Sequence, residues 1–307
     1  MKPDGEQPAG IAATLAELVA LRHKLPHGRP GARMGPVPGT RLLRKQSRGM
    51  EFAESRPYLP GDDVRSMDWR QTARRGMPYT KLFQEEHGRP VQLLVDLGAS
   101  MRFGTRVAFK SVCAARAAAL LAWQAADAGE RVGGIVSSGG AQHEVRVQSR
   151  HHGVLALLQQ LAGASAHPAH LAHSDNRALT ASLQALARTL RPGSLAVIVS
   201  DFDGLDAAQE GVIASLAMRD SVLLVQVYDC FESNPPPGMY CLSDGRRSMA
   251  IDLRPEAARA AYAAPFLART QRLRALACRP RIRLVSLATH DDAASVLFGG
   301  VAGAGTS

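Results

Sequence analysis

The most informative part of the sequence for the fold is Arg89-Pro-Val-Gln-Leu-Leu-Val-Asp-Leu-Gly-Ala-Ser-Met101. Its apolar centre, Val91 to Val95, predicts a buried strand. The Gly/Ser turn after Asp96 leads into a helix that we expect to begin near Thr105. In an open parallel sheet, ligands lie beyond the carboxyl ends of the strands. Asp96 and Ser100 therefore stand where chemistry is most expected.

Strands and helices alternate along the rest of the chain. Further strands are expected at 132–137, 195–200, 221–227 and 282–287, an antiparallel strand at 144–148, and a hairpin of 239–242 with 248–253. Helices are expected over 107–128, 154–161, 179–190, 207–217, 255–277 and 292–297. This alternation predicts an α/β fold, a doubly wound and mostly parallel sheet over residues 90–298. The tail, 299–307, is expected to be disordered.

The residues before the sheet divide into two segments. Residues 1–40 predict a short amphipathic helix at 11–24 and a flexible Pro/Gly-rich linker at 26–38. Residues 41–89 are polar and charged, with Pro60-Gly61 suited to a type II turn and a strand pattern at 79–85. Because so short a segment cannot build its own core without metal or disulfide, we expect this irregular extension to pack on the sheet.

The overall composition is that of an ordinary cytoplasmic protein. Hydrophobic residues make up 46% and charged residues 21% of the chain. No apolar run approaches the roughly 20 residues that span a bilayer, and the start of the chain shows no hydrophobic signal region. The net charge of +10 favours acidic partners. Without an aromatic-studded basic cluster, however, we expect no nucleic acid partner.

The four cysteines show no C-x-x-C spacing, and buried, reduced thiols are expected in place of a zinc site or a disulfide framework. They are Cys113, Cys230, Cys241 and Cys278.

Two motifs carry a family resemblance. The first is Glu51-Phe52 followed by Arg56-x-Tyr58-x-Pro60-Gly61-Asp62-Asp63-x-Arg65-x-x-Asp68-Trp69. The second is the Asp96 loop, followed by Ser200-Asp201-Phe202 and Tyr228-Asp229-x-x-Glu232. Together they resemble the bacterial "domain of unknown function 58" family. Members of that family are similar to von Willebrand A domains, are often associated with MoxR-type AAA+ ATPases and carry no established catalytic activity. The resemblance implies a sheet of the von Willebrand A type and a MoxR-type ATPase as partner.

The Asp96 loop is similar to the Asp-x-Ser-x-Ser loop with which von Willebrand A domains hold a divalent metal. The chain keeps Asp96, Ser100 and, from a third loop, Asp201. Gly98 stands where the pattern has its first Ser, which removes one oxygen ligand. Since Mg²⁺ needs near-octahedral oxygen coordination, the loss weakens the implied site.

A second departure concerns the loop that supplies a Thr in the family pattern. Arg177 stands in its place, although Thr180 or Asp175 are alternative neighbours of the site. A permanent positive charge there would repel a metal ion, and Arg177 could itself pair with Asp96 or Asp201. The resemblance therefore implies a degenerate metal site with weak or absent Mg²⁺ binding, and we expect no required cofactor.

The first motif has two interpretations. Its interleaved carboxylates and arginines suit an ion-pair network that fixes the architecture. Alternatively, the motif is a docking surface with Tyr58 and Trp69 as aromatic anchors and Arg at the rim. The residues concerned are Glu51, Arg56, Tyr58, Pro60, Gly61, Asp62, Asp63, Arg65, Asp68 and Trp69.

The favoured function is a non-enzymatic interaction module, an adaptor for a MoxR-type ATPase. No G-x-x-x-x-G-K-[ST], G-x-G-x-x-G, H-E-x-x-H or G-x-S-x-G motif is present, so neither a nucleotide site nor a hydrolase triad is expected. Two alternatives stay open. One is a metal-dependent phosphohydrolase or nuclease using Asp96 and Asp201. The other is a nucleic-acid binder, which rests on net charge alone.

Overall fold

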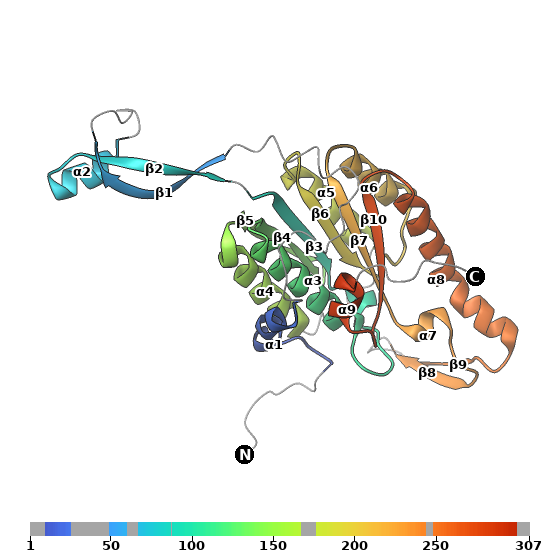
Figure 1. Ribbon diagram of the computed structural model, residues 1–307. Helices are drawn as coiled ribbons and strands as arrows, with labels where there is room; N and C mark the ends of the chain where they lie inside the picture. The colour runs from blue at the N-terminus through green and yellow to red at the C-terminus, as the bar shows by residue number, and fades with distance from the viewer. Residues whose placement is uncertain are drawn as a thin grey trace, which may run out of the picture. The chain divides into compact units, whose positions relative to one another are not determined.

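The computed structural model describes residues 10–25, 49–59, 67–86, 88–166, 176–243 and 248–299 (Figure 1). They belong to two compact units, one of residues 44–88 and the other of residues 1–43 and 89–307. The predicted linker at 26–38, the Pro60-Gly61 turn and the tail beyond Gly299 lie outside the described residues.

A six-stranded sheet forms the centre of the larger unit. Its strands are β3 (Pro90–Asp96), β4 (Arg131–Ser138), β5 (Ala141–Gln148), β6 (Leu195–Ser200), β7 (Ser221–Tyr228) and β10 (Ile282–Ala288). They lie in the order β10-β7-β6-β3-β4-β5, and all neighbours are parallel except β4 and β5. Counted along the chain, this order is 3-2-1-4-5-6, that of a doubly wound sheet with an antiparallel edge strand. The predicted fold class is confirmed.

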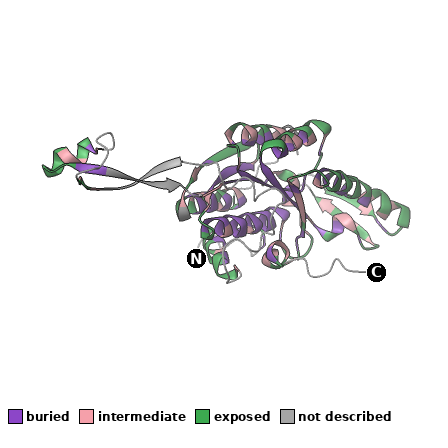
Figure 2. Cartoon of the chain, turned by 45° about the horizontal axis from the view of Figure 1, so that its top comes forward, coloured by how far each residue is buried: buried purple, intermediate pink, exposed green. Residues whose placement is uncertain are grey.

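Helices cover both faces of this sheet, so its central strands are apolar on both sides. On β3, Leu93 packs in one core and Leu94 in the other, because successive side chains point to opposite faces. Figure 2 shows the burial concentrated in the sheet and on the helix sides that face it. The first face is covered by α1 (Leu15–Ala20), α3 (Lys110–Asp127), α4 (Arg150–Ala166) and α9 (Ala293–Phe298), and the second by α5 (Asn176–Thr189), α6 (Ala207–Arg219) and α8 (Glu256–Ala277).

Several short elements complete the larger unit. The helix predicted at 11–24 is α1 followed by a 3₁₀ turn, η1 (Leu21–Lys24). The predicted hairpin forms as β8 (Met239–Ser243) with β9 (Ser248–Asp252). Two short helices were not predicted, η3 (Ala99–Arg102) and α7 (Cys230–Ser233). Among the described residues, no helix is both long and apolar enough to cross a membrane.

Two expectations for the larger unit are wrong in detail. The helix expected to begin near Thr105 is α3, which begins at Lys110. Thr105 stays in the preceding loop because its backbone N–H and its hydroxyl both donate to Asp229. The second wrong expectation is that the cysteines are buried. All four are free, but only Cys113 is buried, and Cys230, Cys241 and Cys278 are exposed.

The smaller unit is an antiparallel pair of strands with a helix between them. β1 (Gly49–Pro57) pairs with β2 (Tyr79–Glu86), and α2 (Trp69–Arg75) lies between them in the chain. Asp68 caps α2 by accepting from the N–H groups of Arg70 and Gln71, and Gly76 ends it with a left-handed φ of 68°. The strand predicted at 79–85 is confirmed. The expectation of an irregular segment is wrong, while its packing on the sheet stays a prediction.

Candidate functional site

The two carboxylates singled out by the sequence meet at the carboxyl edge of the sheet. β3 and β6 are parallel neighbours, with Val95 paired to Val199. Asp96 ends β3, and Asp201 directly follows β6. The chain winds outward in opposite directions from these two strands, which makes this edge the switch point where doubly wound sheets bind ligands.

Asp96 is held by its own loop and by the neighbouring strand. Its Oδ1 accepts from the Gly98 N–H at 2.9 Å, and its Oδ2 accepts from the Ser200 hydroxyl at 2.8 Å. Burial raises the pKa of Asp96 to about 6, and the negative charge of Asp201 adds to the increase. Both carboxylate oxygens are therefore engaged in internal hydrogen bonds.

Asp201 is almost completely buried and carries three internal bonds. Its Oδ1 accepts from the Ser100 hydroxyl at 3.2 Å and from the Asp203 N–H at 3.0 Å. Its Oδ2 accepts from Lys110 Nζ at 2.7 Å. Burial alone would raise the pKa of Asp201, but the charge and hydrogen bond of Lys110, together with the Asp203 N–H and the Arg269 charge, outweigh burial and the pKa is lowered. The pKa values of the two carboxylates are thus shifted in opposite directions.

Lys110 is the functional residue that the sequence patterns do not indicate. It is the first residue of α3 and only 2% exposed. Its ammonium donates to Asp201 and, at 3.0 Å, to Glu232 Oε1. Burial would lower the pKa of Lys110, but the two carboxylates raise it above its ordinary value. The one signal in the sequence is a single Lys at the start of a long, Ala-rich helix.

A second cation extends the network. Arg269, on α8 and 8% exposed, donates to Asp203 Oδ1 at 2.9 Å and reaches Glu232 Oε1 at 3.5 Å. Glu232 in turn is fixed by a capping box, since its Oε2 accepts from the Asp229 N–H at 2.9 Å. This geometry explains the Asp229-x-x-Glu232 spacing. The spacing turns one carboxylate oxygen toward the helix cap and leaves the other for Lys110 and Arg269.

The backbone beside Asp201 is strained. Phe202 has a φ of 54°, in the left-handed region that a bulky residue rarely adopts. Two features hold it there: its side chain is fully buried, and its N–H donates to the Ser200 hydroxyl at 2.9 Å. Ser200 thereby links the Asp96 carboxylate to the turn that presents Asp201.

The remaining predicted site residues are placed as follows. Ser100 joins Asp201, and Gly98 contributes only its N–H. A Cβ built on Gly98 would lie 3.1 Å from Asp96 Oδ1, so the loop is closely fitted to glycine. Thr180 instead accepts from Gln209 Nε2 at 3.1 Å. The side chain of Arg177, like Asp175, lies outside the described residues, so its pairing with Asp96 or Asp201 stays a prediction.

These residues, as arranged, do not fit a divalent metal ion. The Lys110 ammonium lies on the Asp201 oxygen that such an ion would need, and two cations sharing one carboxylate would repel each other. Gly98 offers no side-chain oxygen to replace hydration water. Over the part of the chain that the structure describes, no three His, Cys, Asp or Glu side chains are grouped so as to hold a metal ion.

Residues of the first motif have different surroundings in the smaller unit. Asp68 is architectural, since it caps α2. Arg56 donates to the Pro57 carbonyl at 3.1 Å, a local contact. Tyr58 is half-buried and Trp69 is 66% exposed, as a docking residue would be. The side chain of Glu51, and Pro60, Gly61, Asp62, Asp63 and Arg65, lie outside the described residues.

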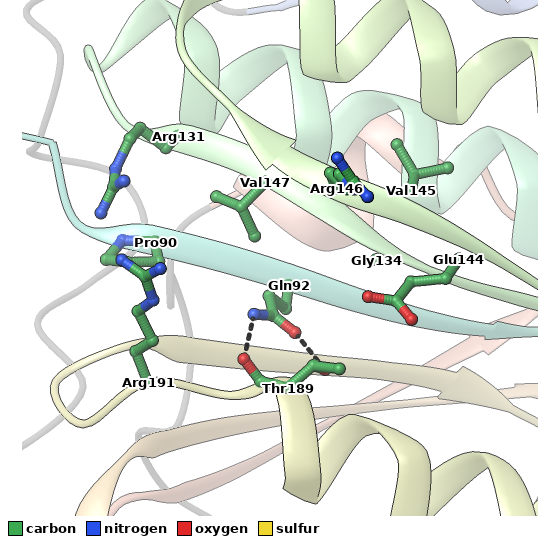
Figure 3. Close-up of a pocket in the computed structure, with 10 residues that line it drawn as sticks. All are labelled: Pro90, Gln92, Arg131, Gly134, Glu144, Val145, Arg146, Val147, Thr189 and Arg191. Carbon is green, nitrogen blue, oxygen red and sulfur yellow. Dashed lines mark hydrogen bonds between the residues drawn. The ribbon is translucent and has the colours of Figure 1, made fainter. Parts of the chain in front are cut away.

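A pocket of about 270 Å³ lies at the opposite edge of the sheet, near the amino ends of β3 and β4 (Figure 3). Its floor is closed by Gln92, which donates to the Thr189 carbonyl and accepts from the Thr189 hydroxyl, both at 3.0 Å. Figure 3 shows Arg131 and Arg191 on either side of Pro90. The acid pair of Asp96 and Asp201 does not reach this pocket.

Several solved structures resemble the chain at low sequence identity. An aerotolerance-related membrane protein from Bacteroides fragilis is 16% identical with a TM-score of 0.41, covering 68% of this chain and 95% of its own. BatB from Bacteroides thetaiotaomicron is 15% identical with a TM-score of 0.37, and the match covers 62% of this chain and 100% of the BatB chain. A von Willebrand factor type A protein from Catenulispora acidiphila is 12% identical with a TM-score of 0.35, covering 71% and 42%.

The sequence relatives are closer. Uncharacterized proteins from Mycobacterium tuberculosis and Mycobacterium bovis are 32% identical over 270 residues, covering 86% of this chain and 81% of theirs. The model of the family described as "Protein of unknown function DUF58" matches residues 54–273. That match includes the Arg56 to Trp69 part of the first motif, the acid pair, Lys110 and Arg269. The chain belongs to the DUF58 family.

Proposed function

We propose that this chain is a non-enzymatic interaction module, an adaptor for a MoxR-type AAA+ ATPase, which recognises its partner without a bound metal. The observation that carries the proposal is an exposed apolar and basic surface on the smaller unit. The family resemblance supplies the class of partner. The proposal keeps the cytoplasmic location expected from the sequence.

This surface, the α2 surface, gathers at one end of the hairpin. The Tyr58 N–H donates to the Pro78 carbonyl and the Asp68 N–H to the Tyr79 carbonyl, both at 2.8 Å. These bonds bring the neighbouring apolar side chains to the same end of the unit. The surface comprises Leu59 (58% exposed), Trp69 (66%) and Met77 (54%), together with Arg70, Arg74 and Arg75.

The composition of the α2 surface is that of an interface centre. Trp, Met and Arg are enriched where proteins bind one another, and Trp and Arg dominate the binding energy. Arg70, Arg74 and Arg75 are all exposed, and the Arg75 guanidinium lies 5.3 Å from the Tyr79 ring. An apolar centre beside arginines suits an acidic, partly apolar patch on the ATPase.

The hydrogen bonds of Asp96 and Asp201 support a role without catalysis. Asp96 and Asp201 have all four carboxylate oxygens engaged in internal bonds. Asp201 is also only 1% exposed. A general acid or base must lie within hydrogen-bond reach of a substrate proton, and the Asp201 carboxylate is closed off from solvent.

The experiment that tests the proposal is a calorimetric titration of the chain into a MoxR-type ATPase from the same organism. Trp69→Ala should weaken binding by about 30-fold, since a buried interface Trp is worth about 2 kcal/mol or more. Met218→Ala is the matched control, because Met218 is an 81% exposed apolar residue of the other unit, and its affinity should match the native chain.

Any of three results would overturn the proposal. The first is a native chain that does not bind the ATPase, and the second is a Trp69→Ala variant that binds as well as the native chain does. The third is hydrolysis of a generic phosphoester panel with Mg²⁺ or Mn²⁺ that disappears in Asp201→Asn.

A further inference from the structure

We infer that the Lys110 ammonium is the chain's own substitute for a divalent cation, and that removing it opens a latent metal site at the carboxyl edge of the sheet. The inference rests on one part of the proposed function, namely that the chain recognises its partner without a bound metal. Its readouts are metal binding and stability. Failure to bind an ATPase would therefore count against the proposed function alone.

The surroundings of Lys110 are built for an ammonium. Two of its three protons are directed to Asp201 Oδ2 at 2.7 Å and Glu232 Oε1 at 3.0 Å. The ring of Phe103 lies 5.7 Å from Nζ, within the range of a cation–π contact. A divalent ion could reach Asp201 Oδ2 only by displacing this ammonium.

The position of Lys110 is costly without the carboxylates. A buried ammonium loses its hydration. A cation in the first turn of a helix also lies against the positive end of the helix dipole, and Lys110 is the first residue of the long helix α3. Asp201 and Glu232 offset both costs, so the ammonium and the two carboxylates form a single unit.

The backbone fixes Lys110 at this point. Its N–H donates to the Phe103 carbonyl at 2.8 Å, which ties the start of α3 to the end of the Asp96 loop. Phe109, the residue before it, donates to the Gly10 carbonyl at 2.9 Å. The helix therefore begins where its first side chain faces Asp201. The Lys110 ammonium binds Asp201 at the point where a metal ion would otherwise bind.

Removal of the ammonium leaves an excess of negative charge. Asp201, Glu232 and Asp203 would face Arg269 as the remaining basic partner that the structure shows for this network. Asp201 and Ser100 would then present free oxygens to the vacated space, beside the Asp96 loop. An acidic, oxygen-lined space is what Mn²⁺ and Mg²⁺ bind.

The test compares variants of the full chain with and without Mn²⁺. Lys110→Ala removes the charge and vacates the space, whereas Lys110→Met removes the charge but fills the space. In chelator, both should lower the thermal midpoint by roughly 10 °C, since an unpaired buried charge is strongly destabilising. Millimolar Mn²⁺ should restore at least half of that loss in Lys110→Ala and none in Lys110→Met.

Two further measurements keep the outcome decisive. If Lys110→Ala does not fold in chelator, Lys110→Ala/Glu232→Gln has one buried carboxylate fewer and should show the same Mn²⁺ dependence. The native chain, titrated with Mn²⁺ in a calorimeter, should bind at least 100-fold more weakly than the variant that Mn²⁺ rescues. Tight Mn²⁺ binding by the native chain overturns the inference, as does equal rescue, or no rescue, of the Ala and Met variants.

Discussion

At the scale of single residues, Asp229 joins three loops at the carboxyl edge. Its oxygens accept from the Thr105 hydroxyl at 2.7 Å, the Thr289 hydroxyl at 2.7 Å and the Phe231 N–H at 2.9 Å. Burial alone would raise the pKa of Asp229, but the hydrogen bonds to its charged form outweigh burial and the pKa is lowered. Asp229 therefore stabilises the fold as a carboxylate.

The sign of the resulting pH dependence follows from that lowered pKa. The contribution is complete above the unfolded pKa of about 4 and is lost as pH falls through the folded pKa. Asp229→Asn should lower the free energy of unfolding by about 2 kcal/mol at pH 7 and by less at pH 3. Urea unfolding at both pH values measures this, and an equal difference at the two would contradict the assignment.

The meeting of Asp96, Ser100 and Asp201 could be predicted because it depends only on local patterns. Two apolar strands end in Asp, and the carboxyl ends of parallel strands share one edge. Lys110 could not be predicted in the same way. Its role depends on where α3 begins, and that start is set by Thr105 bonding to Asp229, a residue far away in the sequence.

At the scale of elements, α4 packs against β4 through a glycine. A Cβ added to Gly153 would overlap the Val132 carbonyl oxygen, whereas one added to Gly163 on the same helix would meet open space. Gly153→Ala should therefore lower the free energy of unfolding by about 1–3 kcal/mol. The matched control Gly163→Ala should raise it by up to about 1 kcal/mol, because Ala is the better helix former.

Denaturant unfolding of these two variants measures both effects. Equal behaviour of Gly153→Ala and Gly163→Ala would show that α4 does not approach β4 as closely as described.

The elements of the main sheet were predictable because apolar runs of strand length alternate with helical patterns between Gly and Pro turns. Strand β1 was not predictable in this way, and the reason lies in how it pairs with β2. Phe52 pairs with Phe83, but a bulge falls between Phe52 and Glu54. A bulge interrupts the two-residue alternation by which a strand is recognised in sequence. α2 was missed as well, because it is short and largely polar.

At the scale of the whole molecule, the two units carry different properties. The smaller unit holds the exposed α2 surface, and the larger unit holds the buried charge network around Lys110. We therefore assign partner recognition to the smaller unit and the metal-free acidic site around Lys110 to the larger unit. Family membership follows from motifs spread over both units, which is why it could be predicted from the sequence before the charge network was known.

Anomalous diffraction at the manganese edge, from crystals of the native chain grown in Mn²⁺, shows whether Lys110 or a metal ion occupies the carboxyl edge of the sheet. We expect no anomalous peak between Asp96, Ser100 and Asp201, and density for the Lys110 side chain running to Asp201 and Glu232. A peak bonded to Asp201, with Lys110 turned away from it, would show that the native site holds a metal ion.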